Sequence, residues 1–204
     1  MKEYKVQHIY KQYGTQQVLN DFSLHIMQGE ICCIMGESGI GKTTLLRIMM
    51  GLEDPDQGEV QQGVRVSAVF QEDRLIQELT AEANVRMVCR KRYSGMKEEI
   101  RQALLQVLPE DCLNKRVKEL SGGMRRRVAV VRAMLAESDL VLMDEPFTGL
   151  DLKSKEKVIH FIRGYQKNRM IVVSTHQKED AGFLNAKICL LTREDPSLTM
   201  IDNI

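Results

Sequence analysis

The residues with the most definite chemistry form a glycine-rich loop, Gly36-Glu37-Ser38-Gly39-Ile40-Gly41-Lys42-Thr43. The loop matches the pattern G-x-x-x-x-G-K-[ST], whose backbone N–H groups surround phosphate oxygens. An apolar run at 31–35 precedes it, and an apolar-faced helix is expected at 44–50. Such a loop places phosphate at a helix N-terminus, where unpaired N–H groups favour anions. The pattern therefore predicts a nucleotide site, with Lys42 reaching the β- and γ-phosphates and the Thr43 hydroxyl ligating Mg²⁺.

Two adjacent carboxylates, Asp144 and Glu145, form the second candidate site. They follow the apolar run 140–143, which is typical of a buried strand. Because an unpaired buried carboxylate is costly, a metal is expected at this point. One acid can hold Mg²⁺ while the other polarises a water molecule.

The elements that must position these groups alternate along the chain. Further apolar runs at 64–70, 170–174 and 188–191 predict strands, and helices are expected between them. This alternation is typical of a parallel sheet whose functional residues lie at the carboxyl ends of the strands. Gln71, Asp144 and His176 all follow such ends, so the sequence predicts that they meet at one edge.

The remaining segments predict smaller units. Alternating residues over 4–31, with turns at Gly14 and Gly29, indicate an antiparallel β unit, and residues 53–58 indicate a turn. Helical periodicity covers 80–113, with a break at 93–95. Ser121 is a good N-cap for the next helix, whose arginines at 125–127 lie off its apolar stripe and are expected to be exposed. A short polar tail is expected after residue 191.

The composition argues against several classes of protein. The 204 residues are 43% hydrophobic and 28% charged, as in an ordinary globular domain. A formal net charge of +1 argues against a general nucleic-acid binder. Five cysteines without a C-x-x-C pair indicate buried, reduced thiols, which suits a cytosolic compartment. There is no apolar run near the roughly 18 residues of a membrane span and no signal-peptide pattern, so any membrane component is expected to be another chain.

The phosphate loop, Leu120-Ser121-Gly122-Gly123 and Asp144-Glu145, in this order, resemble the motifs of the ATP-binding subunits of ABC transporters. Leu-Ser-Gly-Gly is the most specific of them, because ordinary P-loop kinases and GTPases lack it. The resemblance covers nearly the whole chain and implies one α/β domain over 1–204. Its P-loop NTPase core, with a mainly parallel sheet and the small N-terminal antiparallel β unit, would span 1–71 and 119–204. An α-helical subdomain would span 72–118.

The resemblance also implies a role for each motif residue. Glu145 is implied as the base that activates the attacking water, and His176 as the residue that contacts the γ-phosphate. Tyr13, which by itself would be interpreted as a half-buried turn aromatic, is implied to stack on adenine. The implied nucleotide-binding residues are Tyr13, Gly36, Glu37, Ser38, Gly39, Ile40, Gly41, Lys42, Thr43, Thr44, Gln71, Ser121, Gly122, Gly123 and Asp151. The implied catalytic residues are Glu145, His176, Lys42 and Gln71, and the implied Mg²⁺ residues are Thr43, Gln71 and Asp144.

The implied function is ATP hydrolysis by a closed homodimer or heterodimer that drives a membrane permease from the cytoplasmic face of the membrane. An importer would also use a substrate-binding protein, and no nucleic acid is implied. Residues 71–75 and 144–147 are similar to the importer branch that serves nitrate, sulfonate and taurine, whereas Met124 and the segment 174–179 depart from the common pattern. The alternatives are a non-transport soluble or ribosome-associated ABC ATPase, an ATP-sensing regulatory module and a P-loop small-molecule kinase.

Overall fold

The computed structural model describes residues 2–89, 96–192 and 199–201. Its centre is a six-stranded sheet in the order β5-β6-β7-β3-β8-β9. The first five strands are mutually parallel, as the alternating pattern predicts, and the sixth is antiparallel to β8. The bounds are β3 Ile31–Met35, β5 Val66–Val69, β6 Leu140–Asp144, β7 Met170–Thr175, β8 Lys187–Leu190 and β9 Thr199–Ile201.

The polar tail expected after residue 191 is corrected by β9, which pairs with the outer edge of β8. An edge strand offers unpaired backbone N–H and C=O groups, so a following segment can pair there whatever its side chains are. Three residues are too short to give a periodic sequence signal. The expectation of a tail was therefore wrong for residues 199–201.

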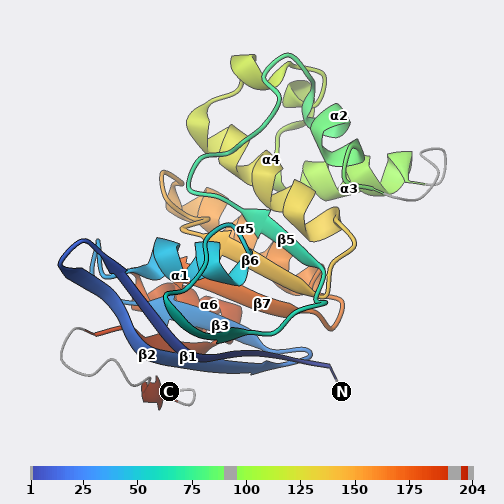
Figure 1. The fold of residues 1–204 in the computed structure, drawn as a ribbon. Helices are drawn as coiled ribbons and strands as arrows, with labels where there is room; N and C mark the ends of the chain where they lie inside the picture. Colours follow the sequence, from blue (N-terminus) through green and yellow to red (C-terminus); the bar gives the residue numbers. More distant parts are fainter. Residues whose placement is uncertain (1, 90–95, 193–198, 202–204) are drawn as a thin grey trace.

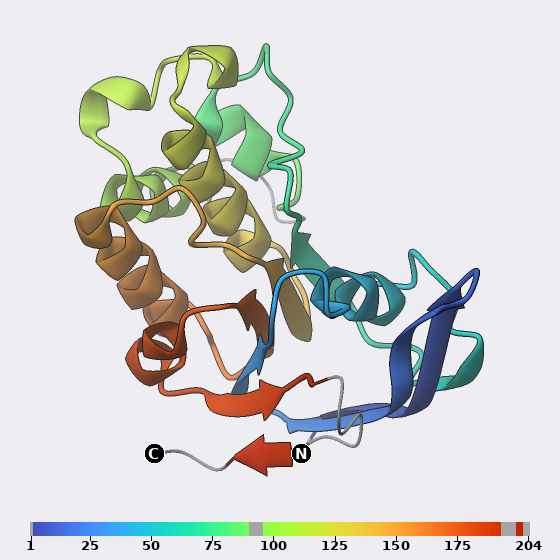
Figure 2. The ribbon, with the colours of Figure 1, turned by 90° about the vertical axis from the view of Figure 1, so that its left-hand side faces the viewer.

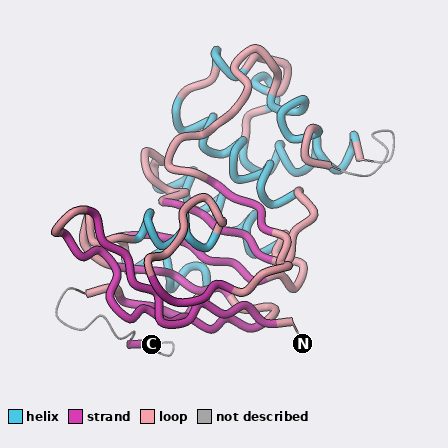
Figure 3. Tube along the Cα trace, in the orientation of Figure 1, coloured by secondary structure: helices cyan, strands magenta, loops and turns pink. Residues whose placement is uncertain are grey.

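A second, three-stranded antiparallel sheet lies beside the first (Figures 1 and 3). Its strands are β1 Glu3–Tyr13, β2 Gln16–Met27 and β4 Gln57–Val60, in the order β2-β1-β4. The hairpin of β1 and β2 confirms the predicted N-terminal β unit. The expected turn at 53–58 extends too far, because residues 57 and 58 already belong to β4. At Gly58 a Cβ atom would lie 2.2 Å from the carbonyl oxygen of His8, so the glycine permits the close approach of β4 to β1.

Two hydrophobic cores cover the two faces of the parallel sheet. On one face α1, Lys42–Met49, packs between this sheet and the antiparallel one, with Phe22, Leu45 and Leu142 in a common cluster. On the other face lie α4, Gly122–Leu135, α5, Leu152–Gly164, and α6, Lys178–Leu184. Figure 2 shows both layers from the side. Because helices cover both faces, β3, β6 and β7 are buried along their whole length, which explains their continuous apolar runs.

The helical part of the chain lies above β5 in Figure 1. It contains α2, Ala81–Arg86, α3, Lys97–Val107, and two short 3₁₀ turns, Glu110–Cys112 and Val117–Glu119. Both helices pack against α4, which in turn contacts β5. Two helices are confirmed within 80–113, but α3 ends at Val107 and only a 3₁₀ turn follows, so the expected limit at 113 was too far; the predicted break at 93–95 lies outside the described residues. None of the described helices is long and apolar enough to cross a membrane.

The arginines of α4 correct an expectation. Val128 and Val131 of the predicted stripe are fully buried, but Arg126 and Arg127 are also buried, at 8% and 9% exposure. The segments packed around α4 supply backbone carbonyls that bind both guanidinium groups. Arg126 donates to the carbonyls of Phe70 and Gln71, and Arg127 donates to that of Val107 at 2.6 Å. A buried charge that is hydrogen-bonded in this way is tolerated, so both side chains stay inside.

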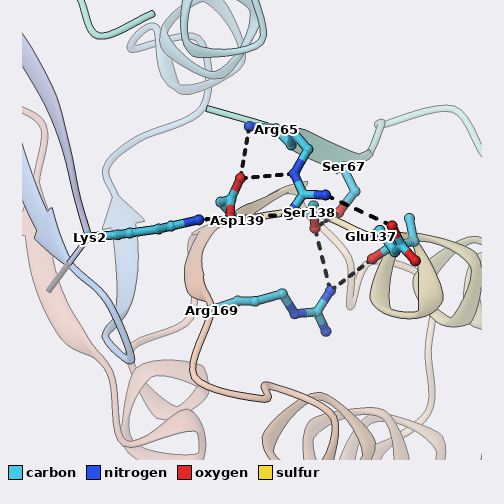
Figure 4. Close-up of polar contacts among 8 residues, drawn as sticks. Lys2, Arg65, Ser67, Glu137, Ser138, Asp139 and Arg169 are labelled. Carbon is cyan, nitrogen blue, oxygen red and sulfur yellow. Dashed lines mark hydrogen bonds and ion pairs between the residues drawn. The ribbon is translucent and has the colours of Figure 1, made fainter. Parts of the chain in front are cut away.

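Arg169 and Asp139 organise the amino-terminal edge of the parallel sheet (Figure 4). Arg169 donates to Met134 O at 2.9 Å and Ala136 O at 3.3 Å, at the end of α4, and to Tyr165 O at 2.6 Å, at the end of α5. Asp139 accepts hydrogen bonds from the side chains of Arg65 and Lys2. One arginine thus binds the carboxyl ends of two helices, and one carboxylate joins β6 to two other segments.

Candidate active site

The phosphate loop connects β3 to α1, as predicted, and two of its glycines, Gly36 and Gly41, are sterically required. A Cβ atom at Gly36 would lie 2.7 Å from Leu191 O, and one at Gly41 would lie 2.7 Å from Val18 Cγ1. Gly41 also has a φ of 118°. Lys42 is only 5% exposed, and its ammonium donates to Gly36 O at 2.7 Å and Glu37 O at 2.8 Å. The loop therefore curves around a cation, next to the N-terminus of α1, which is the arrangement that phosphate binding needs.

Tyr13 ends β1 beside the phosphate loop and is 49% exposed. Its hydroxyl donates to a carboxylate oxygen of Glu53, whose other oxygen accepts from Arg47 Nε at 3.1 Å. The hydrogen bond to Glu53, with a smaller effect of burial, raises the pKa of Tyr13, and the Thr44 hydroxyl also interacts with it. The half-exposed ring thus has a fixed position near α1. Sequence reasoning missed Glu53, which lies in a stretch that indicated only a turn.

The paired acids stand where β6 ends, and β7 supplies their common partner. Asp144 is 4% exposed. Ser174 Oγ donates to Asp144 Oδ1 at 2.7 Å and accepts a hydrogen bond from the backbone N–H of Glu145 at 2.9 Å. Glu145 has a φ of 47°, an uncommon conformation for a residue with a side chain. Sequence reasoning missed Ser174, although a polar residue inside the apolar run 170–174 was a signal that could have found it.

Glu145 and His176 line one pocket of about 360 Å³. The turn 147–150, the end of β7 and the start of α6 complete its walls. Thr148 Oγ1 donates to Glu145 Oε2 at 3.1 Å, so the carboxylate is held at the pocket wall. Of the three residues predicted to meet at this edge, His176 lines the pocket, whereas Gln71 and Asp144 do not.

A buried ion pair also lines this pocket. The ammonium of Lys155, on α5, binds the carboxylate of Asp180, on α6, and also the side-chain oxygen of Gln177. Thr175 Oγ1 donates to the other Asp180 oxygen at 2.5 Å. These contacts fix the segment that carries His176 between β7 and α6. Neither charged residue had a motif to mark it in the sequence.

The signature residues lie outside this pocket. Ser121 caps α4 as predicted, accepting a hydrogen bond from Met124 N at 3.2 Å, and both Ser121 and Gly122 are exposed. A Cβ atom at Gly123 would lie 3.4 Å from Gly149 O, so the motif packs against the turn that lines the pocket. Asp151 caps α5, and the hydrogen bonds from the backbone and hydroxyl of Ser154 lower its pKa. No residue of 36–43, 71 or 121–123 lines the pocket of Glu145 and His176.

The described residues also fit a magnesium ion. Magnesium prefers oxygen ligands and usually takes one or two protein groups together with substrate phosphates and water. Thr43 and Asp144 supply a hydroxyl and a carboxylate, and one oxygen of Asp144 is already oriented by Ser174. In the described part of the chain no group of three or more His, Cys, Asp or Glu could hold a metal alone. A metal shared with bound phosphates is the kind of site that this donor set suits.

Comparisons with known proteins agree with this geometry. The profile described as "ABC transporter" matches residues 19–148. The chain is 35% identical over 200 residues to the spermidine/putrescine import ATP-binding protein PotA of Legionella pneumophila (strain Paris), covering 90% of this chain and 55% of that protein. It is 35% identical over 189 residues to the aliphatic sulfonates import ATP-binding protein SsuB 2 of Pseudomonas savastanoi pv. phaseolicola (strain 1448A / Race 6), covering 92% of this chain and 70% of that protein.

A solved structure shows the same fold. It is the dimeric structure of an ATP-binding cassette in a post-hydrolysis state, bound to ADP and Pi, with a TM-score of 0.83, 27% identity and 98% of each chain covered. This chain spans just over half the length of the first curated relatives that it matches. The phosphate loop, the Leu-Ser-Gly-Gly motif and the Asp-Glu pair thus occupy the expected elements of a known fold, and the chain belongs to the ABC transporter family.

Proposed function

We propose that this chain binds and hydrolyses MgATP as one subunit of a dimer that drives a membrane permease. One observation carries the proposal: β3, β6 and β7 are neighbours, and their carboxyl ends place the phosphate loop, the paired acids and His176 along one edge of the sheet. In parallel α/β sheets, ligands bind at that edge.

Hydrolysis is an in-line attack of water on the γ-phosphate, in which charge stabilisation and positioning supply most of the catalysis. Glu145 accepts the proton of the attacking water, Lys42 neutralises charge on the transferred phosphoryl group, and His176 orients the γ-phosphate. Gln71 approaches the water from the end of β5. Thr43 and Asp144, with Gln71 nearby, hold Mg²⁺, which supplies further charge neutralisation when bound. Tyr13 stacks on the adenine.

A second subunit completes each site in this proposal. Ser121 and Gly123 lie outside the pocket of Glu145 and His176, and the exposed N-terminus of α4 offers N–H groups to a phosphate. In a head-to-tail dimer these groups contact ATP bound to the other subunit, and Asp151 lies at the interface. The dimeric state of the solved relative supports this arrangement.

Transport and localisation complete the proposal. The relatives PotA and SsuB 2 are named import ATP-binding proteins, which supports an importer, including the sulfonate-type branch. The chain would bind a permease through residues 72–118 at the cytoplasmic face of the membrane, as a homodimer or heterodimer, with a substrate-binding protein on the other side. The division into 1–71 with 119–204 and 72–118 is part of this proposal.

The variant Glu145→Gln tests the function. We expect ATP binding to be retained and turnover to fall about 10²–10⁴-fold, the range for loss of a general base. The exposed acid Glu156 on α5 supplies the control, Glu156→Gln, with normal turnover. Normal turnover in Glu145→Gln would reject the assigned base.

The partner is tested by capturing Glu145→Gln from gently solubilised native cells with and without MgATP. Co-purification of a multi-span membrane protein supports the transport motor. Ribosomal or other soluble partners, with no membrane protein in either condition, would support a non-transport ABC ATPase instead. Uptake measured in reconstituted vesicles then distinguishes import from export.

A further inference from the structure

The hydroxyl of Ser174 joins the two acids of the active site. Ser174 is fully buried in β7 and lies directly across from Asp144 in the register of β6 and β7. Because a carboxylate only accepts and a backbone N–H only donates, the single Ser174 proton goes to Asp144 and an oxygen lone pair receives the Glu145 N–H. The single proton of the hydroxyl is therefore committed to Asp144 while one lone pair holds the Glu145 N–H.

The first contact orients the proposed metal ligand. Asp144 Oδ1 is bound to Ser174 at 2.7 Å, whereas Oδ2 accepts no hydrogen bond from the described residues. A carboxylate held through one oxygen presents the other in a fixed direction. Partners of this kind raise metal affinity because the ligand is already oriented.

The second contact orients the proposed base. Glu145 adopts a φ of 47°, and its backbone N–H is bound to Ser174 Oγ at 2.9 Å. Without the hydroxyl, this N–H would lose its partner in a partly buried position, and the peptide would be free to leave the left-handed conformation. The Glu145 side chain would then leave its place beside Thr148 and His176 in the pocket.

We propose that Ser174 is a positioning residue that aligns the Mg²⁺ ligand Asp144 and the base Glu145 together. This inference rests on the ATPase function proposed above and refines its active site. In this proposal Ser174 contacts neither the phosphate nor the metal, but it sets the positions of the two residues that act on them.

The test measures ATP binding as a function of Mg²⁺ concentration, and again in EDTA, for the whole chain. We expect Ser174→Ala to need about 10–100-fold more Mg²⁺ for half-maximal ATP binding, the range for losing a hydrogen-bonded partner of a ligand, with metal-free ATP affinity unchanged. Single-turnover hydrolysis of bound ATP falls as well. Ser174→Thr keeps the hydroxyl and restores both properties.

The control is another serine hydroxyl between neighbouring strands. Ser67 Oγ on β5 lies 2.9 Å from Ser138 Oγ, just before β6, at the opposite end of the sheet. Ser67→Ala therefore removes a hydrogen bond of similar geometry and leaves the Mg²⁺ dependence at the wild-type value. Ser174→Cys, which keeps the side-chain volume but donates weakly, provides a second variant should Ser174→Ala not fold.

Three outcomes separate the possibilities. An unchanged Mg²⁺ dependence in Ser174→Ala and Ser174→Cys, or an equal shift in Ser67→Ala, overturns the role of Ser174. A wild-type chain that binds MgATP but does not hydrolyse it rejects the proposed ATPase, while the binding titration still decides the role of Ser174 at the metal. A wild-type chain that binds no ATP rejects both.

Discussion

Arg126 of α4 binds the main chain of Gln71 through its guanidinium group, so the second residue after β5 is attached to the helix that begins at the Leu-Ser-Gly-Gly motif. A second bond from Arg126 reaches Phe70 O at 2.5 Å, and its Nε lies 3.5 Å from Asp73 Oδ1. Farther along α4, Arg132 donates to Asp73 O at 3.2 Å. The loop that carries Gln71 is therefore hydrogen-bonded to the helix of the signature motif at several points, and we expect the two to move together.

Replacing Arg126 tests this attachment. We expect Arg126→Met to lower the free energy of unfolding by about 2 kcal/mol, because hydrogen bonds from a charged donor contribute roughly 1.5–3 kcal/mol. Steady-state ATPase activity should also fall, since the main chain of Gln71 is no longer held in place by the Arg126 guanidinium. Urea unfolding and an ATPase assay measure the two effects. Arg163 on α5 is exposed and, among the described residues, makes one hydrogen bond, of 3.4 Å to Phe183 O, so Arg163→Met is the control and should leave both quantities unchanged.

The buried pair of Lys155 and Asp180 gives a second prediction. Asp180→Asn leaves the ammonium buried without its counter-charge, and breaking such a pair typically costs about 3–5 kcal/mol. The double variant Lys155→Met/Asp180→Asn should lose less than the sum of the two single variants. At the exposed pair of Lys167 and Glu99, Lys167→Met should change the unfolding free energy by less than about 1 kcal/mol. Additive losses at Lys155 and Asp180 would contradict the coupling.

Asp139 gives a dependence of stability on pH. The side chains of Arg65 and then Lys2 hold the pKa of this carboxyl well below its ordinary value of 3.8. A depressed pKa means that the ionised form stabilises the fold, fully above pH 3.8, and that the contribution disappears as the pH falls through the folded-state pKa. We expect Asp139→Asn to be less stable by about 1–2 kcal/mol at pH 7, as for a hydrogen-bonded, partly exposed ion pair.

This difference between wild type and Asp139→Asn should shrink steadily as the pH is lowered below 3.8, because the wild-type carboxyl then also becomes neutral. Urea unfolding at a series of pH values measures it. A constant difference at every pH would show that packing, and not charge, stabilises this edge of the sheet.

Variants of Tyr13 distinguish the contribution of ring stacking from that of hydrogen bonding at the proposed adenine site. Tyr13→Ala should raise the KM for ATP about 5- to 150-fold, because stacking of a base on an aromatic ring contributes roughly 1–3 kcal/mol. Tyr13→Phe keeps the ring but loses the bond to Glu53, so its KM should rise by a smaller factor. Glu53→Ala, which removes the acceptor of the Tyr13 hydroxyl, should resemble Tyr13→Phe. An unchanged KM in Tyr13→Ala would exclude stacking at this position.

Much of this structure is predictable from local sequence. The β3 strand, the loop to α1 and the acids that follow β6 come from continuous apolar runs and a spaced glycine pattern. The capping of α4 by Ser121 is local as well, because the hydroxyl bonds to an N–H only three residues away. Local patterns of this kind identify an element reliably when the apolar run, the turn residues and the cap all indicate the same boundaries.

What escaped prediction depends on partners far apart in the chain. Arg126 and Arg127 interrupt a helix pattern, and only the carbonyls at 70, 71 and 107 make their burial possible. Ser174 acquires a role because β6 and β7 are adjacent, although 30 residues separate it from Asp144. Lys155 and Asp180 likewise meet only when α5 and α6 pack. Neither periodicity nor motif spacing encodes such pairings.

Arg169 fixes one end of each of two helices and leaves the other end freer to move. It binds α4 and α5 at their carboxyl ends, while Ser121 and Asp151 begin these helices at the opposite ends. At 1.5 Å per residue, α4 is about 21 Å long, so a rotation of about 5° around its fixed end carries Ser121 through about 2 Å. A small rotation of α4 at the amino-terminal edge of the sheet would therefore move the signature motif by a distance comparable to that of a hydrogen bond.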